Sequence, residues 1–100
     1  MRLRRPRRAV VVYTRAGCGL CRSAERLVAA EAHGHEVTHV DVDADPDLQR
    51  AYNLRVPVVA VDGHEVLEGL VEPGDVRRVL RSRPSGPPTR TVRADPEDQR

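Results

Sequence analysis

Runs of apolar and polar residues divide the chain into seven short elements. Residues 9–14 (AVVVYT) are almost entirely apolar and β-branched, which predicts a strand buried on both faces. From Cys18 onward, apolar residues recur with helical spacing until His33-Gly34 ends the run. Residues 36–42 (EVTHVDV) alternate apolar with polar, which is typical of a half-exposed edge strand. Because a long crossover joins them, the two strands are expected to be parallel.

Turn signals separate the elements of the second half. Asp45-Pro46-Asp47 provides a capping residue, a proline at the first helical position and an acid in the first turn, so a helix is predicted to begin there. Residues 58–61 and 64–67 flank Asp62-Gly63, which predicts a two-residue β-hairpin turn. A last helix is predicted near residues 73–81 from its inward-facing apolar positions.

The resulting order is β-α-β-α-β-β-α within residues 9–82. It predicts an α/β fold with a four-stranded mixed sheet, in which two parallel strands precede an antiparallel hairpin and helices cover both faces. Residues 1–8 are expected to be a basic flexible arm. Residues 83–100 have little to bury and are expected to be a disordered tail. The chain is therefore expected to contain one small domain between two extensions.

The charge of the chain is unevenly distributed. Its formal net charge is +2, but residues 1–8 contribute +5 and residues 83–100 contribute +1, so the predicted domain carries −4. The basic arm has no interleaved aromatic residue, and nucleic-acid binding is therefore not expected. All 17 Lys and Arg residues are Arg, which indicates a compositional bias of the genome.

No targeting or membrane segment is expected. The apolar run after the basic start spans only residues 9–12, whereas a signal peptide needs about 7–15 apolar residues at that point. No segment approaches the ~20 apolar residues of a membrane span. A soluble cytoplasmic protein without a membrane partner is therefore predicted.

The two cysteines, Cys18 and Cys21, are the main candidates for chemistry. Cys18 falls where the first strand gives way to the first helix, and the unpaired N–H groups of a helix start lower the pKa of a thiol. Arg15 and Arg22 are expected to add positive potential. Only the thiolate attacks a disulfide, so Cys18 is the predicted nucleophile. Cys21 lies three residues later on the same helical face and is expected to be the more buried, resolving thiol.

Two other interpretations of the cysteines exist. In the first interpretation, both cysteines are buried core residues. This suits Cys21 but does not explain Cys18, which follows Gly17 in a polar loop. In the second, they bind zinc together with His33 and His35. These histidines are only two positions apart, and a helix would carry them roughly 18 Å from the cysteines. No metal site is therefore predicted, although a non-catalytic thiol module that binds a metal or a partner protein remains the alternative to an enzyme.

Three motifs resemble glutaredoxins: YTRAGCGLC at residues 13–21, VPVV at 56–59, and the glycine of LEGL at 67–70. The chain looks most like bacterial glutaredoxin-like proteins with a C-x-L-C site, and the resemblance covers residues 9–82. It implies a thioredoxin-like fold, thiol–disulfide oxidoreductase activity, and a cis peptide bond before Pro57. The expected roles are attack by Cys18 and resolution by Cys21. The expected substrate-binding residues are Arg15, Gly19, Leu20, Val56, Pro57 and Gly69.

The chain departs from the glutaredoxin pattern at two places. Gly19-Leu20 replaces the usual Pro-Tyr between the cysteines, and Glu68-Gly69 replaces the usual Gly-Gly before the last helix. Both changes weaken the expected glutathione site. No resident cofactor is predicted; the expected partners of a monomeric protein are disulfide-containing proteins or low-molecular-weight thiols, with glutathione or mycothiol as co-substrate.

Overall fold

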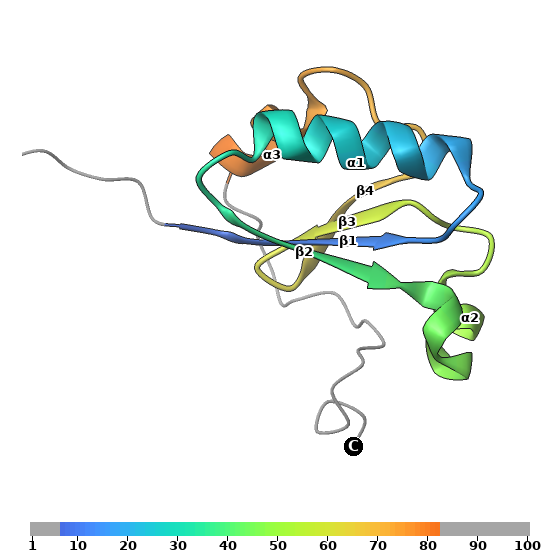
Figure 1. The fold of residues 1–100 in the computed structure, drawn as a ribbon. Helices are drawn as coiled ribbons and strands as arrows, with labels where there is room; N and C mark the ends of the chain where they lie inside the picture. The colour runs from blue at the N-terminus through green and yellow to red at the C-terminus, as the bar shows by residue number, and fades with distance from the viewer. Residues whose placement is uncertain (1–6, 83–100) are drawn as a thin grey trace, which may run out of the picture.

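A four-stranded sheet with the strand order β2-β1-β3-β4 organises the chain (Figure 1). The computed structural model describes residues 7–82; the predicted tail and the first six residues of the predicted arm lie outside this range. The elements are β1 Ala9–Thr14, α1 Gly19–Glu31, β2 Glu36–Asp41, a 3-10 turn Val42–Ala44, α2 Pro46–Tyr52, β3 Val58–Val61, β4 His64–Glu68 and α3 Asp75–Arg81. The predicted order of elements is confirmed.

Strand pairing determines which loops meet. β1 pairs in parallel with β2, which is an edge strand as predicted, and antiparallel with β3. In the β1–β3 ladder Tyr13 lies opposite Val58, and in the antiparallel β3–β4 ladder Val58 lies opposite Glu68. The carboxyl end of β1, the amino end of β3 and the carboxyl end of β4 therefore share one end of the sheet.

Helices cover both faces of the sheet, as predicted: α1 and α3 lie on one face and α2 on the other (Figure 1). Alternate residues of β1 face opposite layers, so Val10 and Val12 pack under α1 and α3 whereas Tyr13 packs against α2. Because the chain has no Trp or Phe, the core is built mainly from Val, Leu and Ala. Within residues 7–82, no helix has the length and apolar character needed to cross a membrane.

The hairpin turn also anchors the start of the domain. Asp62 and Gly63 both have positive φ (52° and 87°), as the predicted two-residue turn requires. The carboxylate of Asp62 accepts hydrogen bonds from the N–H of Ala9 (3.0 Å) and the Nε of Arg8 (2.5 Å). Burial alone would raise the pKa of Asp62, but these two interactions outweigh it and hold the pKa below its usual range.

Arg8 belongs to the domain, one residue before the expected boundary. Its Nη1 donates to the carbonyl of Leu80 (2.8 Å), and its backbone N–H donates to Nδ1 of His35 (3.0 Å). Arg8 was expected in the flexible arm as the last residue of the basic run, and local sequence signals do not reveal partners that lie 27 to 72 residues away in the chain.

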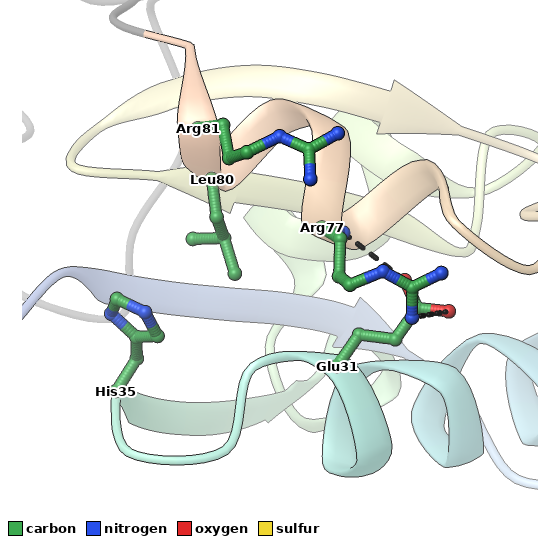
Figure 2. Close-up of a pocket in the computed structure, with 5 residues that line it drawn as sticks. All are labelled: Glu31, His35, Arg77, Leu80 and Arg81. Carbon is green, nitrogen blue, oxygen red and sulfur yellow. Dashed lines mark hydrogen bonds and ion pairs between the residues drawn. The ribbon is translucent and has the colours of Figure 1, made fainter.

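The last helix begins slightly later than predicted, at Asp75, after Gly74 in a left-handed conformation (φ 92°). Glu31 at the end of α1 holds this helix start: its carboxylate accepts the N–H groups of Gly74 (2.8 Å) and Arg77 (3.1 Å). Glu31 and Arg77 line a pocket of about 240 Å³ between the end of α1 and α3. Figure 2 shows the two side chains next to each other. Burial alone would raise the pKa of Glu31, but the backbone hydrogen bonds outweigh it and the pKa is lowered.

The contact between α1 and α3 predicts a pH-dependent loss of stability in the Glu31→Gln variant. At neutral pH the free energy of unfolding should fall by about 1–2 kcal/mol, because charge-assisted hydrogen bonds to two N–H groups are weakened. A carboxyl whose pKa is lowered on folding stabilises the protein above its ordinary pKa and loses this effect as the pH falls through the folded-state pKa. The difference between the variant and the wild type should therefore shrink below about pH 4.

Denaturant unfolding at several pH values checks this prediction. Glu36→Gln is a matched control, because Glu36 is exposed at the start of β2. An equal loss of stability in both variants, or a constant difference down to pH 3, would contradict the role given to Glu31.

Candidate active site

Cys18 occupies the N-cap position of α1, as predicted for the junction between the first strand and the first helix. Gly17 has positive φ (78°), which lets the chain turn sharply out of the loop after β1. Cys18 itself is extended (φ −104°, ψ 114°), and its Sγ accepts the backbone N–H of Cys21 at 3.1 Å. A sulfur at this position faces the N–H groups at the positive end of the helix dipole.

Cys18 and Cys21 are joined as a disulfide, with their Cα atoms 5.1 Å apart. Cys18 is half-buried, whereas Cys21 is completely buried. The prediction that Cys21 is the more buried of the two is therefore confirmed. Cys18 is therefore the more accessible member of the pair.

Val56 and Pro57 lie at the same end of the sheet as the disulfide. Pro57 directly precedes Val58, which pairs with Tyr13 near the end of β1. The Val56–Pro57 peptide bond is cis, as the resemblance to glutaredoxins implied. The carbonyl of Pro57 accepts the N–H of Gly69 at 2.8 Å, so the segment after β4 is attached to the cis-proline segment. The structure thus brings together the segments that contain the predicted site residues around positions 18–21, 56–57 and 69.

Arg15 differs from the other predicted site residues. Its guanidinium donates to both carboxylate oxygens of Asp43 (2.7 and 3.1 Å) and to the carbonyl of Asn53 (2.9 Å). The hydrogen bond with Asp43 raises the pKa of Arg15, and the same contact lowers the pKa of Asp43. Arg15 therefore ties the active-site loop to the residues around α2, and its guanidinium is engaged in the fold.

Arg22 is also paired. Its Nε lies 3.4 Å from a carboxylate oxygen of Glu25, and its Nη2 donates to the carbonyl of Arg15 at 3.4 Å. The positive potential expected from Arg15 and Arg22 is thus offset by Asp43 and Glu25. The N–H groups at the start of α1 are the positive partners that the structure gives to the sulfur of Cys18.

Glu25 was not among the predicted site residues. Its Oε2 accepts the hydroxyl of Thr14 at 2.5 Å, and Thr14 is buried at the end of β1. Glu25 follows Cys21 by four residues, which places the two on one face of α1. The four-residue spacing from Cys21 was the signal in the sequence that could have identified Glu25. The sequence did not indicate the contact of Glu25 with Thr14, which lies 11 residues earlier.

Arg55 and Tyr52, which were also not among the predicted site residues, support the cis-proline segment. Arg55 donates to Glu65 (2.5 Å) and Glu68 (3.0 Å) of β4, and it lies 5.1 Å from the centre of the Tyr52 ring. Tyr52 stacks on Tyr13 (4.3 Å between ring centres), and its hydroxyl donates to Glu65 at 2.9 Å. Burial, followed by the bond to Glu65, raises the pKa of Tyr52. These contacts hold residues 53–57 against both β1 and β4.

Residues 9–81 match the family described as glutaredoxin-like domain (DUF836). The chain belongs to this family. Among curated proteins, no sequence matches the chain. With the paired cysteines, family membership supports a thiol–disulfide redox function in general terms.

Solved structures agree with this assignment. The chain is similar to the protein XcR50 from X. campestris, with 33% identity and a TM-score of 0.66 over 75% of this chain and 99% of that chain. It is similar to protein Ne2328 from Nitrosomonas europaea, with 30% identity and a TM-score of 0.56 over 80% and 98% of the two chains. It is also similar to a mutant thioredoxin from Halobacterium salinarum, with 25% identity and a TM-score of 0.54 over 74% and 72%. The fold of this glutaredoxin-like domain is thioredoxin-like.

The alternative zinc ligands do not meet in the structure. His33 and His35 follow the far end of α1, whereas Cys18 lies at its start. Nδ1 of His35 accepts the N–H of Arg8. Across residues 7–82, the structure contains no group of three or more His, Cys, Asp or Glu side chains that could hold a metal ion.

Metal analysis of protein purified under reducing conditions should give far less than one zinc per chain, because the cysteines and histidines lie at opposite ends of α1. Inductively coupled plasma mass spectrometry measures this content directly. Stoichiometric zinc that is lost equally in Cys18→Ser and His33→Ala would contradict both the helix geometry and the redox assignment.

Proposed function

We propose that this glutaredoxin-like protein is a thiol–disulfide oxidoreductase that works by dithiol exchange through Cys18 and Cys21. The observation that carries the proposal is the asymmetry of the pair: a partly exposed sulfur at the start of a helix is joined to a completely buried one. As a structural cross-link the disulfide would add little stability, because it joins residues only three positions apart in the chain.

The proposed cycle begins with the reduced protein. The Cys18 thiolate attacks one sulfur of a substrate disulfide, and the other substrate sulfur leaves as a thiolate and takes up a proton. Cys21 then loses its proton and attacks the sulfur of Cys18, which releases the remaining substrate sulfur. Two electrons pass to the substrate, and the Cys18–Cys21 disulfide forms. Two molecules of an external thiol then reduce this disulfide through a mixed disulfide on the protein, and they leave as the disulfide of that thiol.

The substrate is proposed to bind across the loops that meet at this end of the sheet. Gly19 and Leu20 lie beside Cys18 in sequence, and Gly69 is hydrogen-bonded to Pro57. By resemblance, the backbone of Val56 pairs with the substrate. Low-molecular-weight thiols such as glutathione or mycothiol are proposed as reductants, without a resident cofactor, and the reducing cytoplasm is the compartment that suits a dithiol.

The first consequence concerns the reactivity of Cys18. In the Cys21→Ser variant the backbone N–H that faces the Cys18 sulfur is retained, so the thiolate should still be favoured. The rate of alkylation by iodoacetamide, measured against pH, should have its midpoint below the ordinary thiol pKa of about 8.5. A midpoint at or above that value would remove the basis for Cys18 as an activated nucleophile.

The second consequence concerns the resolving step. The Cys21→Ser variant should trap covalent partners, because attack by Cys18 is retained while the second nucleophile is lost. A non-reducing gel of a cell extract should show discrete heavier bands that collapse when reductant is added.

The control is Cys18→Ser, which should trap nothing, because Cys21 is completely buried. Empty lanes for both variants, together with no small-thiol adduct on Cys18 by mass spectrometry, would favour a non-catalytic thiol module.

A further inference from the structure

Three large apolar side chains are exposed on segments at the end of the sheet that bears the disulfide: Leu20 (46% exposed), Leu54 (93%) and Leu70 (61%). We call them the leucine rim. None of them belongs to the two apolar clusters of the core. A single exposed leucine needs no explanation, but exposed apolar side chains gathered at one end of a small domain are typical of a binding surface.

The sheet topology places the leucine rim at one end of the molecule. Leu20 is the second residue of α1, two positions after Cys18. Leu54 lies three residues before Pro57 at the start of β3, and Leu70 follows Gly69 after the end of β4. These two loops are joined by the hydrogen bond between Gly69 and Pro57. Figure 1 shows the loops after β1, before β3 and after β4 at the same end of the sheet.

The charged groups near the rim do not suit glutathione, which carries two carboxylates. The cations on the surrounding loops and the first turn of α1 are Arg15, Arg22 and Arg55, and each is paired with a carboxylate of the protein. Glu68, which is half-exposed, adds a negative charge beside Gly69. The end of the domain that bears the disulfide therefore presents apolar side chains and paired cations.

We propose that the leucine rim binds apolar side chains on either side of the cysteine in an extended polypeptide, so the preferred substrates are protein disulfides within apolar segments. This inference rests on the proposed function and specifies its substrate class. An apolar polypeptide gains from contact with the leucines and needs no free cation, whereas glutathione gains little from either feature.

The proposal is tested with two synthetic peptides that each contain one cysteine, flanked by Leu and Val in the first and by Ser and Gln in the second. Each cysteine carries thionitrobenzoate as a mixed disulfide. Reduction by the protein dithiol yields the peptide thiol, free thionitrobenzoate and the Cys18–Cys21 disulfide, so release of the chromophore follows the reaction in a stopped-flow instrument. The same adduct of glutathione is the third probe.

The apolar peptide should react about tenfold faster than the polar peptide and the glutathione adduct, a difference equivalent to about 1.4 kcal/mol. This preference should fall toward one in Leu54→Ser and Leu70→Ser, whose exposed side chains can change with little effect on the fold. Val37→Thr is the matched control, because Val37 is the other exposed large apolar residue of the described range but lies on the edge strand β2. It should keep the full preference.

The outcomes separate the two claims. If all three probes react at one rate that is well above the rate with Cys18→Ser, the oxidoreductase proposal stands and the substrate class is wrong. If no probe reacts faster than with Cys18→Ser, the proposed function itself fails. Sedimentation that shows a dimer dissociated by Leu54→Ser would assign the rim to a second copy of the chain and would overturn the proposal.

Discussion

The position of Cys18 at the N-cap of α1 is the constraint on which the rest of the site depends. The chain leaves β1, turns at Gly17 and enters the helix, so the cysteine that caps the helix is also the partly exposed one. The helix then determines the position of Cys21, which lies three residues later under the same surface and is completely buried. The difference in exposure between the two cysteines and the contact of Cys18 with the helix start thus have one geometric origin, and the proposed order of the two reactions follows from it.

The antiparallel pairing of β1 with β3 adds the second half of the site. Because Tyr13 lies opposite Val58, the cis-proline segment is placed at the end of the sheet where Cys18 begins α1. Stacking of Tyr52 on Tyr13 and the ion pairs of Arg55 with β4 hold this segment in place. The charged side chains near the disulfide are largely used in this way, whereas Leu20, Leu54 and Leu70 remain exposed.

Local sequence signals predicted the elements well. The β-branched run of β1, the Asp45 cap of α2 and the Asp62-Gly63 turn each depend on neighbouring residues, and each lies where expected. The cysteine asymmetry followed from the position of Cys18 at the helix start. The cis bond before Pro57 came from the resemblance to glutaredoxins and had no local signal of its own.

Interactions between distant residues could not be predicted in this way. Arg15 was expected at the site, but its guanidinium binds Asp43, 28 residues later. Arg8 was expected in a flexible arm, but it bonds to Asp62 and Leu80. The hydrogen bond between Thr14 and Glu25 likewise depends on how β1 packs against α1. Such pairings are decided by the packing of the domain, which residue types and spacing do not reveal.

The most direct test of the redox account is the equilibrium of the Cys18–Cys21 pair with a thiol buffer. The fraction of disulfide, measured by alkylation and mass spectrometry across buffers of known potential, should follow a single two-electron transition near about −200 mV, as in glutaredoxins. This result would mean that cellular thiols can reduce the pair and that the corresponding disulfides can reoxidise it. A disulfide that stays intact below about −300 mV would behave as a structural cross-link and would contradict the account.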